Sequence, residues 1–247
     1  MKPPRARLDR LLANLGYGSR REVAALVAAG QVTLDGARLA DAAARIEVTA
    51  DLARRMHVAG ARLDPPAPFT LIMHKPLGLV CSHREPGRSI YELLPARWRA
   101  RMPALSSIGR LDADTTGLLP ITDDGDLLHR IISPRRHVAK RYHVALDRPL
   151  AGDEGAIFAE GSLTLDGERL APAQLETLSQ NTAFLTITEG RYHQVRRMFL
   201  AVGLEVIGLH RDRIGGLDLP ADLGSGQYRP ATAAEQALLL APSGTGQ

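Results

Sequence analysis

The sequence predicts an α+β protein with a small basic domain followed by a larger domain built on a mixed, largely antiparallel sheet with flanking helices. Apolar residues follow a helical period near the N-terminus, a proline-rich segment follows, and strands and helices then mix without regular βαβ alternation. We expect domains over 1–62 and 69–240, a stiff linker over 63–68 and a disordered tail over 241–247.

The composition narrows the class of protein. The 247 residues are 45% hydrophobic, which is enough for a packed core, and no stretch approaches the roughly 18 apolar residues of a membrane helix. One cysteine, Cys81, excludes an internal disulfide and a cysteine-rich metal site. The charged N-terminus lacks the apolar block of a secretory signal, so we expect a cytoplasmic protein.

The positive charge is concentrated at the N-terminus. The chain carries a net charge of +4, and residues 1–62 hold 11 basic and 6 acidic residues. Arginine outnumbers lysine heavily, which suits phosphate binding and favours a polyanionic partner. Arginine-biased codon usage in a GC-rich genome predicts the same composition.

The first domain reads as two helices and a hairpin. A first helix follows from the helical spacing of Leu8, Leu11, Leu12 and Leu15. Ser19 and Glu22 form a capping-box pattern that opens a second helix ending at Gly30. Segments 32–34 and 37–39 flank an Asp-Gly turn and predict a hairpin. Arg20 and Arg21 lie in the first turn of the second helix, outside its apolar stripe.

In the second domain the expected elements are short. A strand begins at Phe69, helices are expected over 126–132, 193–202 and 232–240, and further strands over 118–122, 142–146, 163–165, 182–188 and 206–210. Pro120 falls inside an expected strand, where its missing N–H predicts an unpaired position or a bulge.

Three segments of this domain could carry chemistry. Segment 109–119 is a glycine-bracketed loop with Arg110, Asp112 and Asp114, although such segments are usually surface turns. Segment 133–144 interleaves cations with Tyr142, which suits stacking on a base beside a phosphate; the alternative is a charged edge strand. In segment 188–199 a strand meets a helix at Arg191, where side chains commonly face a cleft.

In this order and spacing, the three segments closely resemble those of the RsuA-type pseudouridine synthases, which isomerise uridine in ribosomal RNA. The resemblance covers nearly the whole chain: residues 5–62 resemble an S4-type RNA-binding domain and the chain from 69 onward the catalytic domain. Ser133-Pro134-Arg135, Tyr192-His193 and segment 209–216 resemble most closely the enzyme for small-subunit (16S) RNA, with a 23S RNA enzyme as the alternative.

The resemblance implies a mechanism without metal or cofactor. Asp112 would be the catalytic carboxylate, acting at C1′, on the uracil ring or on a sugar proton. Arg191 would pair with Asp112, and Tyr142 would stack on the uracil and assist removal of the C5 proton. The base would be flipped out of the RNA, with Arg110 filling its place or holding its phosphate. The residues implied to line the site are Arg110, Leu111, Thr116 and Val195.

The expected RNA contacts are the cations near these segments. They are Arg20, Arg21, Lys75, Arg135, Arg136, Lys140, Arg196 and Arg197. We expect ribosomal RNA or its assembly intermediate as the partner, no membrane partner and a monomer.

Three other interpretations remain. Asp112-Ala113-Asp114-Thr115 has the Asp-x-Asp-x-Thr form of haloacid-dehalogenase-type phosphatases, but the segment before it is a poor match for their strand. An S4-type protein that binds ribosomes without catalysis is the second. A metal site at Asp123, Asp124, Asp126 and His129 is the third, and a helix cap explains these residues more simply.

Overall fold

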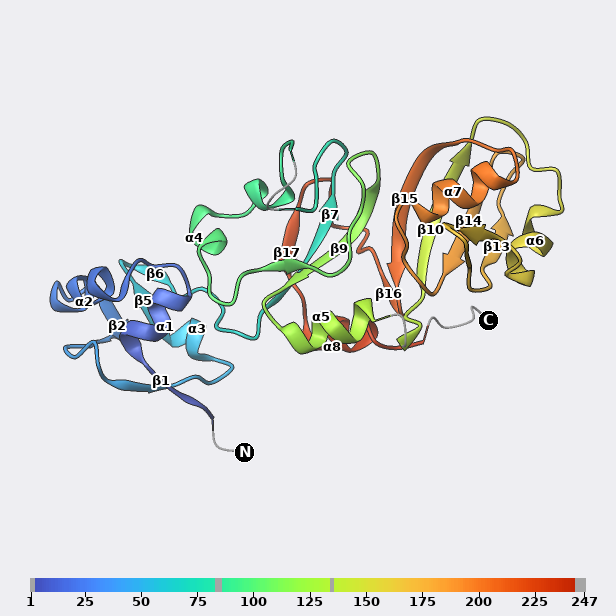
Figure 1. Cartoon of the computed structure of the whole chain (residues 1–247). Helices are drawn as coiled ribbons and strands as arrows, with labels where there is room; N and C mark the ends of the chain where they lie inside the picture. Colours follow the sequence, from blue (N-terminus) through green and yellow to red (C-terminus); the bar gives the residue numbers. More distant parts are fainter. Residues whose placement is uncertain (1–2, 83–85, 134–135, 243–247) are drawn as a thin grey trace. The chain divides into compact units, whose positions relative to one another are not determined.

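The computed structural model describes residues 3–82, 86–133 and 136–242, which form two compact units (Figure 1). Unit 1 comprises Met1–Phe69 with Tyr91–Ser106, and unit 2 comprises Thr70–Ile90 with Ser107–Gln247. Segment 91–106 therefore groups with the N-terminal residues, although it lies inside the span expected for the second domain.

Hydrogen bonds explain this grouping. Arg97 donates to both carboxylate oxygens of Asp64, at 2.6 and 2.9 Å, and the amide of Met102 donates to the carbonyl of Asn14. A bidentate arginine–carboxylate pair of this kind fixes geometry as well as charge. The proline-rich stretch before Phe69 is thus tied to the chain that follows it.

Unit 1 contains the two helices and the hairpin expected from its sequence, and also two short helices that the sequence did not predict. Its helices are α1 (Leu8–Asn14), α2 (Arg20–Ala28), α3 (Leu52–Arg55) and α4 (Ala96–Arg99). One sheet has the order β3 (Ala37–Arg38), β2 (Val32–Leu34), β5 (Met56–Val58), β6 (Ala61–Arg62), and β1 (Arg5–Arg7) pairs with β4 (Arg45–Glu47). The capping box of Ser19 and Glu22 is confirmed. Leu8, Leu12 and Val23 are fully buried in the core between the helices and the sheet.

Unit 2 is built on one mixed, nine-stranded sheet. Its order is β13 (Gln174–Thr177), β14 (Thr182–Ile187), β10 (Lys140–Leu146), β15 (Val206–Ile214), β9 (Thr116–Thr122), β7 (Thr70–Lys75) and β17 (Tyr228–Pro230), with β16 (Leu217–Asp218) on β15 and β8 (Ser106–Ser107) on β9. Strands β15 and β9 run parallel, and the other pairs along this order are antiparallel. The expected fold class, α+β with a largely antiparallel sheet, is confirmed.

Helices and a small hairpin complete this unit. They are α5 (Gly125–Ile132), α6 (Glu154–Glu160), α7 (Gln194–Ala201), α8 (Ala233–Leu238) and the hairpin of β11 (Thr164–Leu165) with β12 (Glu168–Arg169). The short 3₁₀ helix η1 (Ile90–Leu93) lies where the chain passes from unit 2 to unit 1. Leu127 and Ile131 of α5 share a core with Ile72 and Leu118 of the sheet, beside α8 (Figure 1). Phe199 of α7 packs edge-on against α6.

Pro120 lies inside strand β9 opposite Ile72 of β7, and the strand continues past it. The carbonyl of Pro120 accepts a bond from the amide of Ile108, on the side away from β7. Because the N and C=O of one strand residue point the same way, the missing N–H faces that side too. The pairing of β9 with β7 therefore loses no hydrogen bond.

Gly117 brings β9 against β15 at the start of the parallel pair. It has φ +116°, and an added Cβ would lie 2.1 Å from the carbonyl oxygen of Arg211. Only glycine fits such a contact without moving the backbone. This close approach fixes the C-terminal end of the loop that carries Asp112.

Candidate active site

Asp112 lies in a loop, residues 109–115, that strand β7 supports from one side. The Nζ atom of Lys75 donates to the carbonyls of Thr115 at 2.8 Å, Pro76 at 3.0 Å and Ala113 at 3.5 Å. The amide of Gly78 also donates to Ala113. Lys75 is fully buried, and burial lowers its pKa. The expectation that Lys75 contacts RNA is therefore corrected, because its ammonium is buried and donates to three backbone carbonyls.

Helix α7 is a second element that supports the same loop. The guanidinium of Arg196 donates to the carbonyl of Asp114 at 3.2 Å and to that of Val206 at 2.7 Å, and it pairs with the Asp114 carboxylate at 2.9 Å. The amide of Thr115 donates to the carbonyl of Asp112. Every backbone carbonyl from 112 to 115 therefore accepts a hydrogen bond, and the loop is held in one conformation.

The carboxylate of Asp112 remains accessible on this fixed loop. Its side chain is 34% exposed, and the Nε2 atom of His193 lies 3.4 Å from one of its oxygens. His193 has a left-handed backbone, φ +49°, directly before α7. Non-glycine residues in this conformation are uncommon and cluster at functional sites. The imidazole faces the carboxylate because of this sharp corner.

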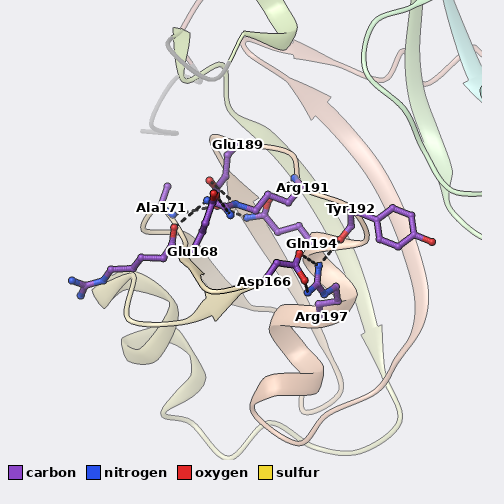
Figure 2. Close-up of polar contacts among 9 residues, drawn as sticks. Asp166, Glu168, Ala171, Glu189, Arg191, Tyr192, Gln194 and Arg197 are labelled. Carbon is purple, nitrogen blue, oxygen red and sulfur yellow. Dashed lines mark hydrogen bonds and ion pairs between the residues drawn. The ribbon is translucent and has the colours of Figure 1, made fainter.

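Arg191 does not make the pair with Asp112 that the resemblance implies. Its guanidinium donates to Glu168 at 2.7 Å and to the carbonyl of Arg169, and Nε lies 3.5 Å from Glu189 (Figure 2). These contacts join the strand-to-helix corner to the β11–β12 hairpin. Among the arginines of this segment, Arg196 is the one that contacts the Asp112 loop.

Gln194 holds the same strand-to-helix segment through hydrogen bonds. Its side-chain oxygen accepts from the amide of Arg191 at 2.9 Å, and its Nε2 donates to Glu189 at 2.7 Å (Figure 2). Glu189 also accepts from the amide of Ala171. The 4% exposed glutamine thus has both ends of its amide satisfied.

Tyr142 lies on β10 with its ring buried, opposite Arg211 of β15. Arg211 is 1% exposed and donates to the carbonyl of Leu118 at 3.0 Å, and its Nη1 lies 3.5 Å from the Tyr142 hydroxyl. Its Nη2 has no partner within the part of the chain that the structure describes. The sequence interpretation assigned Arg211 no role, although the strand period places it on the same face as buried Leu209.

Lys140 is half-buried near Arg211 and donates to the carbonyl of Val138 at 3.1 Å. Burial, together with the positive charge of Arg211, lowers the pKa of Lys140 to about 8. The side of the site formed by β10 and β15 is therefore rich in buried positive charge.

The remaining residues implied to bind substrate lie on or near the Asp112 loop. Leu111 and Val195 are buried, the hydroxyl of Thr116 contacts His210 Nδ1 at 2.8 Å, and the side chain of Arg110 is exposed. Arg110 is therefore the cation of this loop whose side chain is exposed to solvent.

The other expected RNA contacts differ in their surroundings. Arg20 pairs with Asp9, and Arg197 makes a two-pronged pair with Asp166 at 2.7 and 2.9 Å. The side chains of Arg21 and Arg136 are exposed, and Arg135 lies outside the described residues.

The acidic run before α5 forms a helix cap. The carboxylate of Asp124 accepts from the amides of Asp126 and Leu127, each at 3.0 Å. This confirms the capping interpretation of that segment. Within the described residues, no group of three or more His, Cys, Asp or Glu side chains is placed to hold a metal ion. None of the helices described there has the length and apolarity that a membrane crossing requires.

Comparison with known proteins gives a consistent result over both units. Residues 70–201 match the family model of RNA pseudouridylate synthases, and residues 6–52 match that of the S4 domain. The chain is 41% identical over 238 residues to the ribosomal small subunit pseudouridine synthase A of Escherichia coli K12, covering 95% of this chain and 100% of that protein.

Two further matches cover similar lengths. The uncharacterized RNA pseudouridine synthase YtzG of Bacillus subtilis strain 168 is 38% identical over 243 residues, which cover 96% of this chain and 99% of that one. A solved crystal structure of a pseudouridylate synthase matches with a TM-score of 0.66 at 36% identity, covering 94% of this chain and 99% of that chain.

Proposed function

Because the chain belongs to the RNA pseudouridylate synthase family and carries an S4 domain, we propose that it converts one uridine of small-subunit ribosomal RNA to pseudouridine. The relatives named as ribosomal small subunit enzymes support this choice of RNA. One structural observation carries the proposal: a partly exposed carboxylate, Asp112, on a loop whose backbone carbonyls from 112 to 115 all accept hydrogen bonds.

The reaction breaks the N1–C1′ bond, turns the uracil and joins C5 to C1′. Asp112 is the proposed catalytic carboxylate, since an ionised and accurately positioned oxygen is what attack or proton abstraction requires. The loop contacts of Lys75 and Arg196 support this by limiting the movement of Asp112. Catalysis of this kind depends on such preorganisation.

The proposed site takes a base that has left the RNA helix. Tyr142 provides a ring for the uracil, with Arg211 behind its hydroxyl, and Val195 contributes apolar surface. A flipped base costs a few kcal/mol of unpairing, which contacts elsewhere on the RNA must offset. Arg110, exposed beside Asp112, is the proposed substitute for the base in the emptied position.

The test is tritium release from 16S RNA, free or in assembly intermediates, labelled at uridine C5. Wild-type protein should release tritium, and Asp112→Asn should bind the RNA without releasing it. Release by both proteins would show that another group is the catalytic carboxylate. Tight binding without release, on 16S and 23S RNA alike, would identify a non-catalytic RNA-binding protein, and release from 23S RNA alone would identify the large-subunit enzyme.

A further inference from the structure

Tyr192 lies beside the candidate active site, and its side chain is 75% exposed. Among the described residues, no other large hydrophobic side chain is exposed to a greater extent. Its ring is stacked on that of His193, with the centroids 3.8 Å apart and the planes 18° from parallel. Figure 2 shows the ring pointing away from the polar contacts around Glu189 and Gln194. One face of the ring is therefore covered and the other is open to solvent.

The position of this ring is fixed by its neighbours. His193 lies 3.4 Å from Asp112, and its left-handed backbone sets the corner on which Tyr192 is placed. The carbonyl of Tyr192 accepts a bond from Arg197, which Asp166 holds by two further bonds. A ring ordered before binding loses little entropy when it takes a ligand.

From this geometry we infer that Tyr192 and His193 form a stacking platform for the nucleobase next to the target uridine. The inference rests on the proposed function, because it places a flanking nucleotide one ring away from Asp112. When a uridine leaves the stack, its neighbour loses a stacking partner. A flat, open aromatic face replaces that partner, and every base has a π-face to offer.

The chemistry of the two rings suits this ligand. The phenol and the imidazole are both planar, and their spacing is close to that of stacked bases. Tyr192 brings no formal charge, so it adds affinity for a base without adding to the electrostatic attraction for phosphate. Its contribution should consequently survive at salt concentrations that weaken the cationic contacts.

The test uses the full-length protein and short RNAs that span the modified uridine, once it has been mapped by sequencing. One RNA is intact, and two others lack the base on the 5′ or the 3′ side of that uridine. Wild-type protein should lose roughly 5- to 100-fold in affinity for one of the two abasic RNAs. Tyr192→Leu should bind the intact RNA as weakly as wild type binds that abasic RNA, with no further loss on the abasic RNA.

Tyr192→Phe keeps the ring and should behave as wild type. The matched control is Leu200→Ala, since Leu200 is 68% exposed on α7, the helix that follows Tyr192 in the chain, and has no aromatic ring. Equal losses in Tyr192→Leu and Leu200→Ala, or wild-type affinity of Tyr192→Leu for all three RNAs, would overturn the inference.

The proposed function and the platform can fail separately. If wild-type protein makes no pseudouridine, the proposed function fails, and the platform is tested on unmodified 16S RNA by comparing the affinities of Tyr192→Leu and Leu200→Ala. A loss confined to Tyr192→Leu, restored in Tyr192→Phe, still supports the platform. No difference in affinity rejects it.

Discussion

The guanidinium of Arg196 holds Asp114 twice, through its backbone carbonyl at 3.2 Å and its carboxylate at 2.9 Å. Asp114 is two residues beyond Asp112 on the same loop. The third contact of Arg196, to Val206 at 2.7 Å, anchors this arrangement to β15. A helix, a strand and the Asp112 loop are thereby joined through one side chain.

The first prediction concerns this side chain. Arg196→Lys keeps the charge, but one ammonium cannot occupy the places of both Nη1, which donates to Val206, and Nη2, which contacts Asp114. We expect kcat to fall roughly 10- to 100-fold, because small displacements of a catalytic group cost that much, with RNA affinity nearly unchanged. Single-turnover kinetics and equilibrium binding measure the two quantities.

The matched control is Arg213→Lys. Arg213 is 24% exposed, compared with 23% for Arg196, and pairs with Asp218 on the neighbouring strand. The Arg213→Lys substitution should leave kcat unchanged. Weaker RNA binding with an unaltered kcat in Arg196→Lys would instead assign Arg196 to the RNA contacts expected from the sequence.

The second prediction separates Arg191 from Arg196. Arg191 pairs with Glu168 and Glu189, so Arg191→Gln should lower the melting temperature by loosening the β11–β12 hairpin. Its kcat should remain well above that of Arg196→Gln. A loss of turnover in Arg191→Gln as complete as that of Asp112→Asn would show that Arg191 acts directly on the catalytic carboxylate.

The third prediction concerns pH. The pKa of Lys140 is about 8 in the fold against an ordinary value of 10.5, so the unfolded chain binds this proton more tightly. This group therefore destabilises the fold below pH 8, and its penalty disappears as the pH rises from 8 to 10.5. In urea unfolding, Lys140→Met should be more stable than wild type at pH 7, and the difference should shrink at pH 10. A constant difference would contradict the lowered pKa.

The fourth prediction concerns unit 1. Asp9 accepts hydrogen bonds from Arg7 and Arg20, which hold the pKa of its carboxyl well below the ordinary value of 3.8. The contribution to stability is present above pH 4 and is lost as the pH falls through the lowered pKa. Asp9→Asn should lower the urea midpoint at pH 7 and have a smaller effect near pH 2. Equal effects at both pH values would argue against an ionic contribution.

The sequence predicted the long elements well, and it predicted a short element only where a local signal marks it, as the Asp-Gly turn marks the β2–β3 hairpin. α1, α2, α5 and α7 lie within a few residues of their expected bounds, because apolar spacing, caps and glycine stops act locally. Two- and three-residue strands such as β6 and β16 have no local signal, since pairing with distant residues creates them. The affiliation of segment 91–106 depends likewise on side chains such as Arg97 meeting Asp64.

For the site, the sequence could place residues on a loop or strand but not choose their partners. Lys75 and Arg196 looked like surface cations because a buried ammonium or guanidinium needs acceptors that only the folded backbone supplies. Arg191 and Arg196, five residues apart at a corner, point to different neighbours. The burial of Arg211 could have been predicted from the alternation of side chains along β15. The position of His193 could not, because its proximity to Asp112 follows from a left-handed backbone conformation.

The contacts that hold the Asp112 loop also determine the order in which parts of the fold can form during translation. Lys75 and Gly78 precede the loop, but Arg196 and the strand around Arg211, which touches Gly117, lie about eighty to a hundred residues after it. A ribosome must therefore complete most of the second unit before the loop can take its final form. The S4 segment leaves the ribosome long before that point, so a growing chain acquires its RNA-binding part early and its chemistry only after most of the second unit has been made.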